Sequence, residues 1–129
     1  MCGRFADADE ADIVDIFGVQ MVRGHRESSG NVSPTDLVRV IMEDTVQSRL
    51  NGQPVRRELW LARWGLVPSW AKAVGQRSPL INARAETLTV KPSFRAAASQ
   101  RRAIVPAAGY YEWATGPGGK KKQYLLPAS

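Results

Sequence analysis

The chain carries one cysteine, Cys2, directly after the initiator methionine. Removal of Met1 would place a free α-amine and a thiol on adjacent carbon atoms. The ordinary pKa values, roughly 7.7–8.0 for the amine and about 8.5 for the thiol, leave both groups partly nucleophilic near neutral pH. Such an aminothiol can act as an N-terminal nucleophile with its own amine as base, or condense with an aldehyde to a thiazolidine. The alternative is an idle cysteine near a frayed terminus, and position alone does not decide between them.

A second polar cluster contains Asn82, Arg84 and Glu86. Their spacing of two residues would place all three side chains on one face of an extended segment. The alternative is a solvated strand face without chemistry.

A third candidate is Glu112, which lies among aromatic residues in Tyr110–Trp113. Poor solvation there would raise the pKa of the carboxyl group and suit it to acid or base catalysis. The alternative is an ordinary strand position that pairs with Lys121 or Lys122 across a hairpin.

Charge is divided unevenly along the sequence. Residues 1–60 hold seven Lys/Arg and ten Asp/Glu, a net charge of −3, whereas residues 61–129 hold eleven Lys/Arg and two Asp/Glu, a net charge of +9. A polyanionic partner is a natural inference for the second half. The four tryptophans can provide stacking surfaces for unpaired bases, although tryptophan is often simply part of a core.

Length and composition indicate one globular domain. The 129 residues are 43% hydrophobic and 23% charged, as in ordinary soluble proteins. We find no transmembrane run, no signal peptide and no phosphate-binding loop. A single cysteine excludes an internal disulfide framework and a multi-cysteine zinc site, so we expect neither a metal nor another cofactor. A free thiol favours the cytoplasm.

The elements that must position these residues are short. Residues 7–17 predict a helix capped by Asp7 and ended by Gly18. Asn51-Gly52 predicts a two-residue hairpin between strands over 37–43 and 55–64. Further predicted elements are a helix over 93–98, strands over 101–105, 109–113 and 121–126, and a turn at 116–119. His25, the only histidine, falls in a predicted loop and is expected to face solvent. We therefore expect an α+β fold with a mixed or antiparallel, barrel-like sheet and a few short helices.

Six motifs in order resemble those of the SRAP family, the SOS-response-associated peptidase proteins that crosslink covalently to abasic sites in single-stranded DNA. The motifs are Met1-Cys-Gly-Arg-Phe5, Asn31-Val-Ser-Pro-Thr35, Arg63-Trp-Gly-Leu-Val-Pro-Ser-Trp-Ala-Lys72, Ile81-Asn-Ala-Arg-Ala-Glu-Thr87, Pro92-Ser-Phe-Arg95 and Arg102-Ala-Ile-Val-Pro-Ala-Ala-Gly-Tyr-Tyr-Glu-Trp113. Any one motif is a weak signal, but six in order are specific.

The resemblance implies a role for each matched residue. Cys2, exposed when the protein removes its own Met1, would form a thiazolidine with the ring-opened abasic sugar. Asn82 would position lesion and nucleophile, and Glu112 would assist processing and proton transfer. The matched DNA-binding residues are Arg4 and Arg84 for phosphates, and Trp70, Trp113 and Pro34 for flanking bases and the DNA kink. The expected partner is single-stranded DNA with abasic sites, and no membrane or metal.

The resemblance also implies that residues 1–129 are a single SRAP domain lacking its C-terminal portion. The family carries a downstream catalytic histidine, which His25 does not match. Missing strands would then be absent or supplied by another copy, as in a strand-sharing dimer. With Met1 attached, no free aminothiol exists and thiazolidine formation is blocked.

Two other functions fit parts of the sequence. An N-terminal-nucleophile glutamine amidotransferase also opens with Met-Cys-Gly, but it would need neither a basic half nor tryptophan-rich clefts. A non-catalytic nucleic-acid-binding module would show salt-dependent DNA affinity that does not depend on Cys2.

Overall fold

The computed structural model describes residues 2–73 and 78–128. Within these ranges the chain forms six strands, three α-helices and two short 3-10 helices. In chain order they are β1 (Phe5–Asp7), α1 (Glu10–Phe17), β2 (Met21–Val22), β3 (Leu37–Asp44), α2 (Thr45–Asn51), β4 (Arg56–Arg63), η1 (Ala85–Thr87), α3 (Pro92–Gln100), β5 (Ala107–Thr115), η2 (Pro117–Gly119) and β6 (Lys121–Pro127). The predicted α+β class is confirmed.

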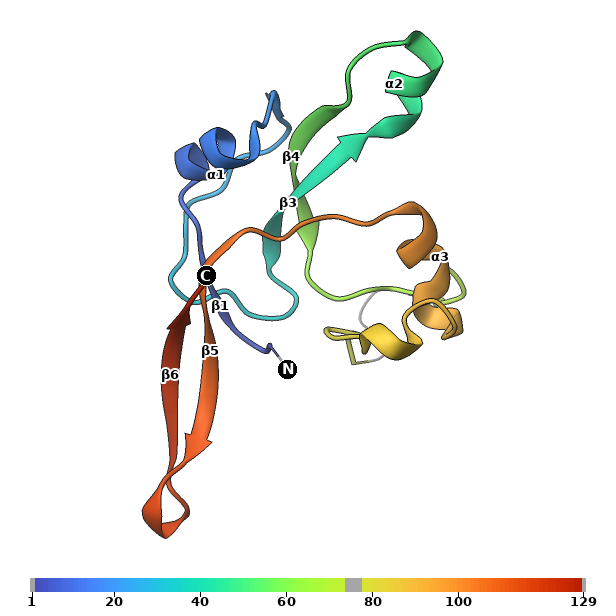
Figure 1. Ribbon diagram of the computed structural model, residues 1–129. Coiled ribbons are helices and arrows are strands. Elements are labelled where there is room, and N and C mark those ends of the chain that lie inside the picture. Colours follow the sequence, from blue (N-terminus) through green and yellow to red (C-terminus); the bar gives the residue numbers. More distant parts are fainter. Residues whose placement is uncertain (1, 74–77, 129) are drawn as a thin grey trace.

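The strands form two three-stranded sheets (Figure 1). The first sheet has the order β1-β5-β6 and is antiparallel. The second has the order β2-β4-β3, with β2 parallel and β3 antiparallel to β4. The expected mixed and antiparallel pairing is confirmed, but the described strands close no barrel: the two sheets are separate, and the segment that leads into β5 meets β3 only through an isolated bridge between Ile41 and Ile104. Within the described ranges that bridge is too short to join the sheets, and it is what remains of the strand predicted over 101–105.

Helix α1 packs on one face of the second sheet. Its only buried side chain within the helix, Ile13, contacts residues of β3 and β4. The Asp9 carboxylate caps the helix by accepting a hydrogen bond from the N–H of Ala11 at 2.9 Å, and Gly18 ends it in the left-handed conformation at φ +61°. The predicted stop at Gly18 is confirmed, but the predicted cap is wrong, because Asp7 ends β1 and binds the partly buried Arg26 instead.

The predicted two-residue hairpin between β3 and β4 is also wrong. The two strands do pair antiparallel, but helix α2 connects them. The Asp44 carboxylate caps α2 by accepting a hydrogen bond from the N–H of Gln47, and Gly52 ends the helix at φ +61°. An Asn-Gly pair signals a glycine in the left-handed conformation, which the end of a helix needs as much as a hairpin does.

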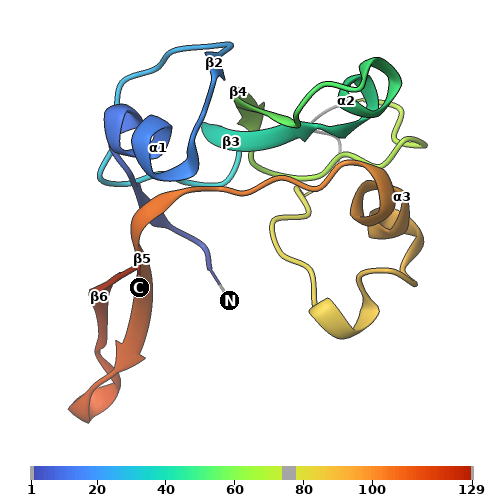
Figure 2. The ribbon, with the colours of Figure 1, turned by 45° about the horizontal axis from the view of Figure 1, so that its top comes forward.

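Strands β5 and β6 form the hairpin that the sequence predicts, with η2 as its turn. Figures 1 and 2 show this hairpin projecting away from the second sheet. Many of its large apolar side chains are exposed, among them those of Tyr110, Trp113, Tyr124, Leu125 and Leu126. The hairpin therefore has an apolar surface that the described part of the chain does not cover.

The core consists of two small clusters. One contains Phe5, Val32, Val38 and Val40, and the other lies beneath α1. The chain exposes 9439 Å² of surface. A compact monomer of 14.2 kDa exposes about 6,800 Å², so this chain leaves roughly 2,600 Å² more in contact with solvent than its mass requires.

Candidate active site around Cys2

Cys2 lies half-buried where the N-terminus meets the first core cluster. Its Sγ donates a hydrogen bond to the carbonyl oxygen of Arg4 at 3.5 Å. The same carbonyl oxygen accepts the N–H of Tyr111 in β5 at 2.9 Å. The cysteine is therefore held against the first sheet and does not project from a loose terminus.

A cavity of about 440 Å³ opens beside Cys2. Apart from Cys2, it is lined by Phe5, Val38, Trp64, Val105, Ala107 and Tyr110. This lining is apolar except for the thiol and the tyrosine hydroxyl. The Phe5 and Trp64 rings pack together with their centroids 5.4 Å apart, which fixes one wall of the cavity.

Asn82 reaches Cys2 from a distant part of the sequence. Its side-chain Nδ2 donates a hydrogen bond to the Cys2 carbonyl oxygen at 2.9 Å. The structure thus brings together two residues that the motifs singled out separately. The expected extended segment does not continue through the second cluster, because Glu86 lies in the 3-10 helix η1, whereas Asn82 and Arg84 precede it outside any helix or strand.

Glu112 lies in the middle of β5, half-buried, directly opposite Tyr124 of β6. The lysines proposed as its alternative partners stand opposite Ala114 and Thr115 instead. Alternation along the strand places Glu112 on the same face as Tyr110, which lines the Cys2 cavity. Glu112 therefore faces the side of the sheet on which Cys2 lies.

Arg4 and Pro34 lie in neighbouring segments. The Arg4 guanidinium donates a hydrogen bond from Nη1 to the Asn31 side chain at 3.1 Å. Pro34 belongs to a tight turn in which the N–H of Asp36 donates to the carbonyl of Ser33 at 3.1 Å. The next residue, Thr35, has φ +77°, a conformation that a β-branched side chain rarely adopts.

Like Arg4 and Pro34, the other predicted DNA-binding residues are not among the described residues that line the Cys2 cavity. Trp70 is 58% exposed on a turn after β4, and Trp113 is 48% exposed on β5. Arg84 is exposed at the start of η1. Trp113 alternates with Glu112, so the two side chains lie on opposite faces of the hairpin.

Sequence reasoning missed Trp64 and Tyr111 as parts of this site. Trp64 lines the cavity, and its indole Nε1 donates a hydrogen bond to the carbonyl of Ile81 at 3.1 Å. The Tyr111 hydroxyl donates to the carbonyl of Gly30 at 2.6 Å and ties β5 to the segment before Pro34. Trp64 stood within a recognised motif, which was a usable signal.

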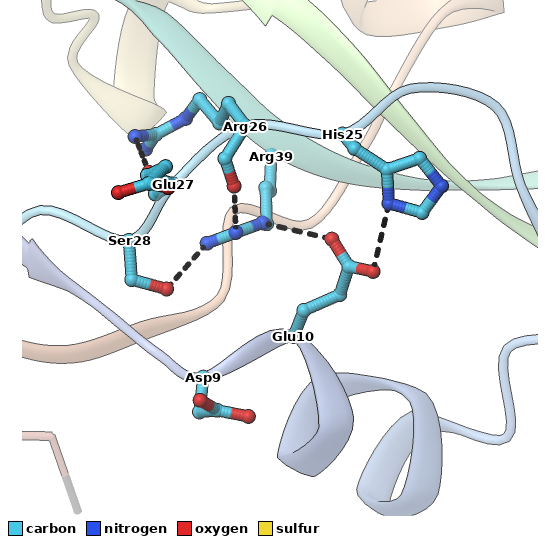
Figure 3. A pocket seen from close by; sticks show the side chains of 7 residues that line it. All are labelled: Asp9, Glu10, His25, Arg26, Glu27, Ser28 and Arg39. Carbon is cyan, nitrogen blue, oxygen red and sulfur yellow. Dashed lines mark hydrogen bonds and ion pairs between the residues drawn. The ribbon is translucent and has the colours of Figure 1, made fainter.

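A second hollow, of about 550 Å³, lies beside α1 (Figure 3). It is lined by Asp9, Glu10, His25, Arg26, Glu27, Ser28 and Arg39. The buried Arg39 donates to the carbonyl of Arg26 at 2.6 Å and to the Ser28 hydroxyl at 3.2 Å, and its Nε lies 3.7 Å from the Glu10 carboxylate. Because Arg39 alternates with Val38 along β3, this hollow opens on the face of the second sheet opposite the Cys2 cavity.

His25 lies at the rim of that second hollow. Its side chain is 74% exposed, and its Nδ1 lies 3.1 Å from the Glu10 carboxylate. The solvent-facing position expected from the sequence is confirmed.

One carboxyl group has a clearly shifted acidity. The hydrogen bond from Arg23 lowers the pKa of Glu58, and a hydrogen bond from the Trp60 indole at 3.0 Å acts in the same direction. The Arg23 guanidinium also lies 5.6 Å from the centre of the Trp60 ring. Glu58 is 8% exposed, so this cluster is partly buried at β4.

The described residues lack two further features. No helix there is long and apolar enough to cross a membrane. No group of three or more His, Cys, Asp or Glu side chains there is arranged to hold a metal ion. The state of Met1 lies outside the described residues.

Comparison with known proteins identifies the family. The family model of the SOS response associated peptidase (SRAP) matches residues 1–128. The chain is 40% identical over 116 residues to the abasic site processing protein YoqW of Bacillus subtilis, covering 88% of this chain and 48% of the relative. It is 33% identical over 102 residues to the abasic site processing protein YMR114C of Saccharomyces cerevisiae, covering 78% and 24%.

A solved structure of a Bordetella bronchiseptica protein superposes with a TM-score of 0.72 at 22% identity, covering 96% of this chain and 56% of that one, which supports the fold. The chain spans about half the length of the Bacillus relative. The match along residues 1–128 shows that the chain belongs to the SRAP family.

Proposed function

We propose that this chain binds single-stranded DNA and that Cys2, after removal of Met1 by the protein itself, crosslinks to abasic sites. The observation that carries the proposal is the hydrogen bond from Asn82 to the Cys2 carbonyl, because it joins two family motifs at one point. Curated relatives that match 88% and 78% of this chain are named abasic site processing proteins.

The chemistry is a condensation. The α-amine of Cys2 attacks the aldehyde carbon of the ring-opened sugar, and loss of one water leaves an imine. The Cys2 thiol then adds to the imine carbon, its proton passes to the nitrogen, and the five-membered thiazolidine closes. Asn82 orients Cys2 through the backbone carbonyl, and Glu112 moves protons from the adjacent face of β5.

The proposed DNA path uses the cations and aromatic rings of the exposed surface. Arg4 and Arg84 bind phosphates, and Trp70 and Trp113 stack on bases that flank the lesion. The turn at Pro34 supports the kink in the strand. Trp113 would meet DNA on the outer face of the hairpin, because it faces away from Glu112.

The decisive experiment uses protein whose intact mass shows that it begins at Cys2. It is incubated with single-stranded DNA that contains one abasic site, and a denaturing gel reports any adduct. We expect an adduct with the wild type, none with Cys2→Ala, and slower formation with Asn82→Ala than with the control Asn51→Ala at the end of α2. Absence of an adduct from the processed wild type would refute the crosslinking proposal.

The same samples separate crosslinking from simple binding. A non-catalytic module would bind DNA with unchanged affinity after Cys2→Ala and give no adduct with the wild type. For the proposed phosphate contact, Arg84→Ala is expected to lower the slope of log affinity against log salt by about 0.7. An unchanged slope would exclude Arg84 from the DNA path.

We further propose that the open edge of β6 pairs with the same edge of a second copy. The N–H of Ala128 donates to the carbonyl of Ala108, so the backbone N–H and C=O groups of the even-numbered residues of β6 point toward β5. The backbone groups of Gln123 and Leu125 therefore point to the open edge. The surface in excess of a compact monomer, roughly 2,600 Å², is large enough for such an interface.

We place the two-fold axis of this pairing at Tyr124. It sets Gln123 against the second copy's Leu125 and Lys122 against the second copy's Leu126, so lysines do not face each other. Light scattering is expected to give the mass of a dimer for the wild type and for Gln123→Thr. Gln123→Pro removes an N–H from the open edge and should give a monomer. A monomeric wild type, or a dimeric Gln123→Pro variant, would contradict the proposal.

A further inference from the structure

Trp64 makes three hydrogen bonds that join separate parts of the site. Its backbone N–H donates to the carbonyl of Asp36 at 2.9 Å, and its own carbonyl accepts the N–H of Thr35 at 2.9 Å. Its indole Nε1 donates to the carbonyl of Ile81 at 3.1 Å. One residue thus holds both the turn that contains Pro34 and the segment that contains Asn82.

The bond to Ile81 has a direct consequence for Asn82. The segment before Asn82 is extended and lies outside the two sheets, and it meets the rest of the chain through a bridge in which the N–H of Leu66 donates to the carbonyl of Leu80 at 3.0 Å. The Trp64 indole N–H binds the carbonyl of the next residue, Ile81. Asn82 follows at once, and its side chain donates to the Cys2 carbonyl at 2.9 Å.

The Trp64 side chain also belongs to the cavity beside Cys2. Its ring packs on Phe5, the first residue of β1. The position of Asn82 is therefore fixed by the Ile81 peptide, which the indole N–H binds. The position of β1, which follows Cys2, is fixed by the packing of Phe5 on the same indole ring. The Trp64 side chain therefore contacts both segments that carry the partners of the Asn82–Cys2 hydrogen bond.

We propose that Trp64 is a positioning residue for the reaction of Cys2. Its indole N–H holds the Ile81 peptide and thereby keeps the Asn82 amide on the Cys2 carbonyl, so that the amine and thiol are presented in one orientation. Trp64 acts through Asn82 and not by contact with DNA. The inference rests on the proposed function for its kinetic part, whereas its structural part stands on the hydrogen bonds alone.

The test is Trp64→Phe, which keeps an aromatic ring against Phe5 and deletes the N–H. The matched control is Trp60→Phe, because the Trp60 indole, four residues earlier and within β4, also donates one hydrogen bond, to Glu58 at 3.0 Å. Thermal unfolding of both variants checks that each is folded. Since one hydrogen bond is at stake, we expect Trp64→Phe to slow adduct formation about two- to tenfold, and Trp60→Phe to leave the rate unchanged.

A double variant distinguishes positioning from general loosening. In an Asn82→Ala background the amide is absent, so Trp64→Phe should cause no further loss of rate. A positioning role through Asn82 predicts this non-additivity. Equal losses in both backgrounds, or a wild-type rate for Trp64→Phe alone, would overturn the proposal.

A measurement without DNA keeps the inference testable if no crosslink forms at all. The sequence has three asparagines, at positions 31, 51 and 82, so selective ¹⁵N labelling gives three side-chain amide signals, and Asn82→Asp assigns one of them. We expect Trp64→Phe to shift the Asn82 amide signal toward that of a solvated amide, and Trp60→Phe to leave it in place. An unmoved Asn82 signal in Trp64→Phe refutes the positioning role whatever the crosslinking assay shows.

Discussion

Replacement of Asp7 by asparagine tests the buried charges that anchor the strand next to Cys2. The Asp7 side chain is 2% exposed, and both its oxygens accept hydrogen bonds from Arg26 at 2.6 Å. One oxygen also accepts the N–H of Ser29 at 2.8 Å, and the buried Arg39 lies 3.9 Å away. Asp7→Asn removes the negative charge and keeps the size and one acceptor oxygen.

The cost follows from the charges that remain. Arg26 and Arg39 would face a neutral amide, and breaking a buried ion pair costs about 3–5 kcal/mol. Because Arg26 is 18% exposed and the amide oxygen still accepts one hydrogen bond, we expect the lower end, about 3 kcal/mol. For a chain of this size each kcal/mol corresponds to about 4 °C, so Tm should fall by about 12 °C.

Urea and thermal unfolding monitored by circular dichroism measure the loss. The control is Glu43→Gln, whose ion pair with Arg57 is 47% and 48% exposed on its two sides and should contribute less than about 1 kcal/mol. If both variants lose the same free energy of unfolding, the buried network does not stabilise β1 as the geometry indicates.

Two further predictions concern the sheets. Since the hydrogen bond from Arg23 lowers the pKa of Glu58, the carboxylate stabilises the fold above its ordinary pKa of about 4.3 and loses that effect as the pH falls through the lower folded value. Wild type should therefore lose more stability than Glu58→Gln between pH 5 and 3 (roughly the window of that linkage), and parallel pH profiles would contradict this. Gly109→Ala would set a Cβ 2.6 Å from the Leu126 carbonyl oxygen and should cost about 1–3 kcal/mol in urea unfolding, whereas Gly30→Ala, with open space around it, should cost less.

Local signals in the sequence predicted the elements that depend on local physics. The apolar spacing of α1 and its glycine stop, and the glycine-rich turn at 116–119, all specify structure within a few residues. The error at Asn51-Gly52 arose because the same left-handed glycine serves a hairpin and the end of a helix. Which one forms depends on whether the preceding residues find a cap, here Asp44.

The site depends on contacts that spacing does not encode. Cys2 and Asn82 are 80 positions apart in the sequence, where only the family motifs link them. In the structure the Asn82 Nδ2 lies 2.9 Å from the Cys2 carbonyl oxygen. Arg39 lies between two core valines in β3, where alternation predicts a solvated side chain, yet it is 3% exposed. It is buried because the loop that follows β2 folds over it and supplies carbonyl and hydroxyl acceptors.

The uneven charge of the sequence has a physical explanation in these contacts. Three of the ten acids of the first sixty residues accept hydrogen bonds from arginines of the same segment: Asp7 pairs with Arg26, Glu58 with Arg23, and Glu43 with Arg57. These pairs cancel locally, and the segment keeps a net charge of −3. The second half has eleven cations and two acids, so carboxylates of that half can neutralise at most two cations. The remaining positive charge lies on the half that supplies Asn82 and β5, where it would attract a polyanion, whereas α1 carries the acids Glu10, Asp12 and Asp15 and would repel one. If this division guides DNA, charge reversal of Arg95 in α3 should slow association with DNA at low salt more than charge reversal of Arg49 in α2, and equal effects would show that the field has no such direction.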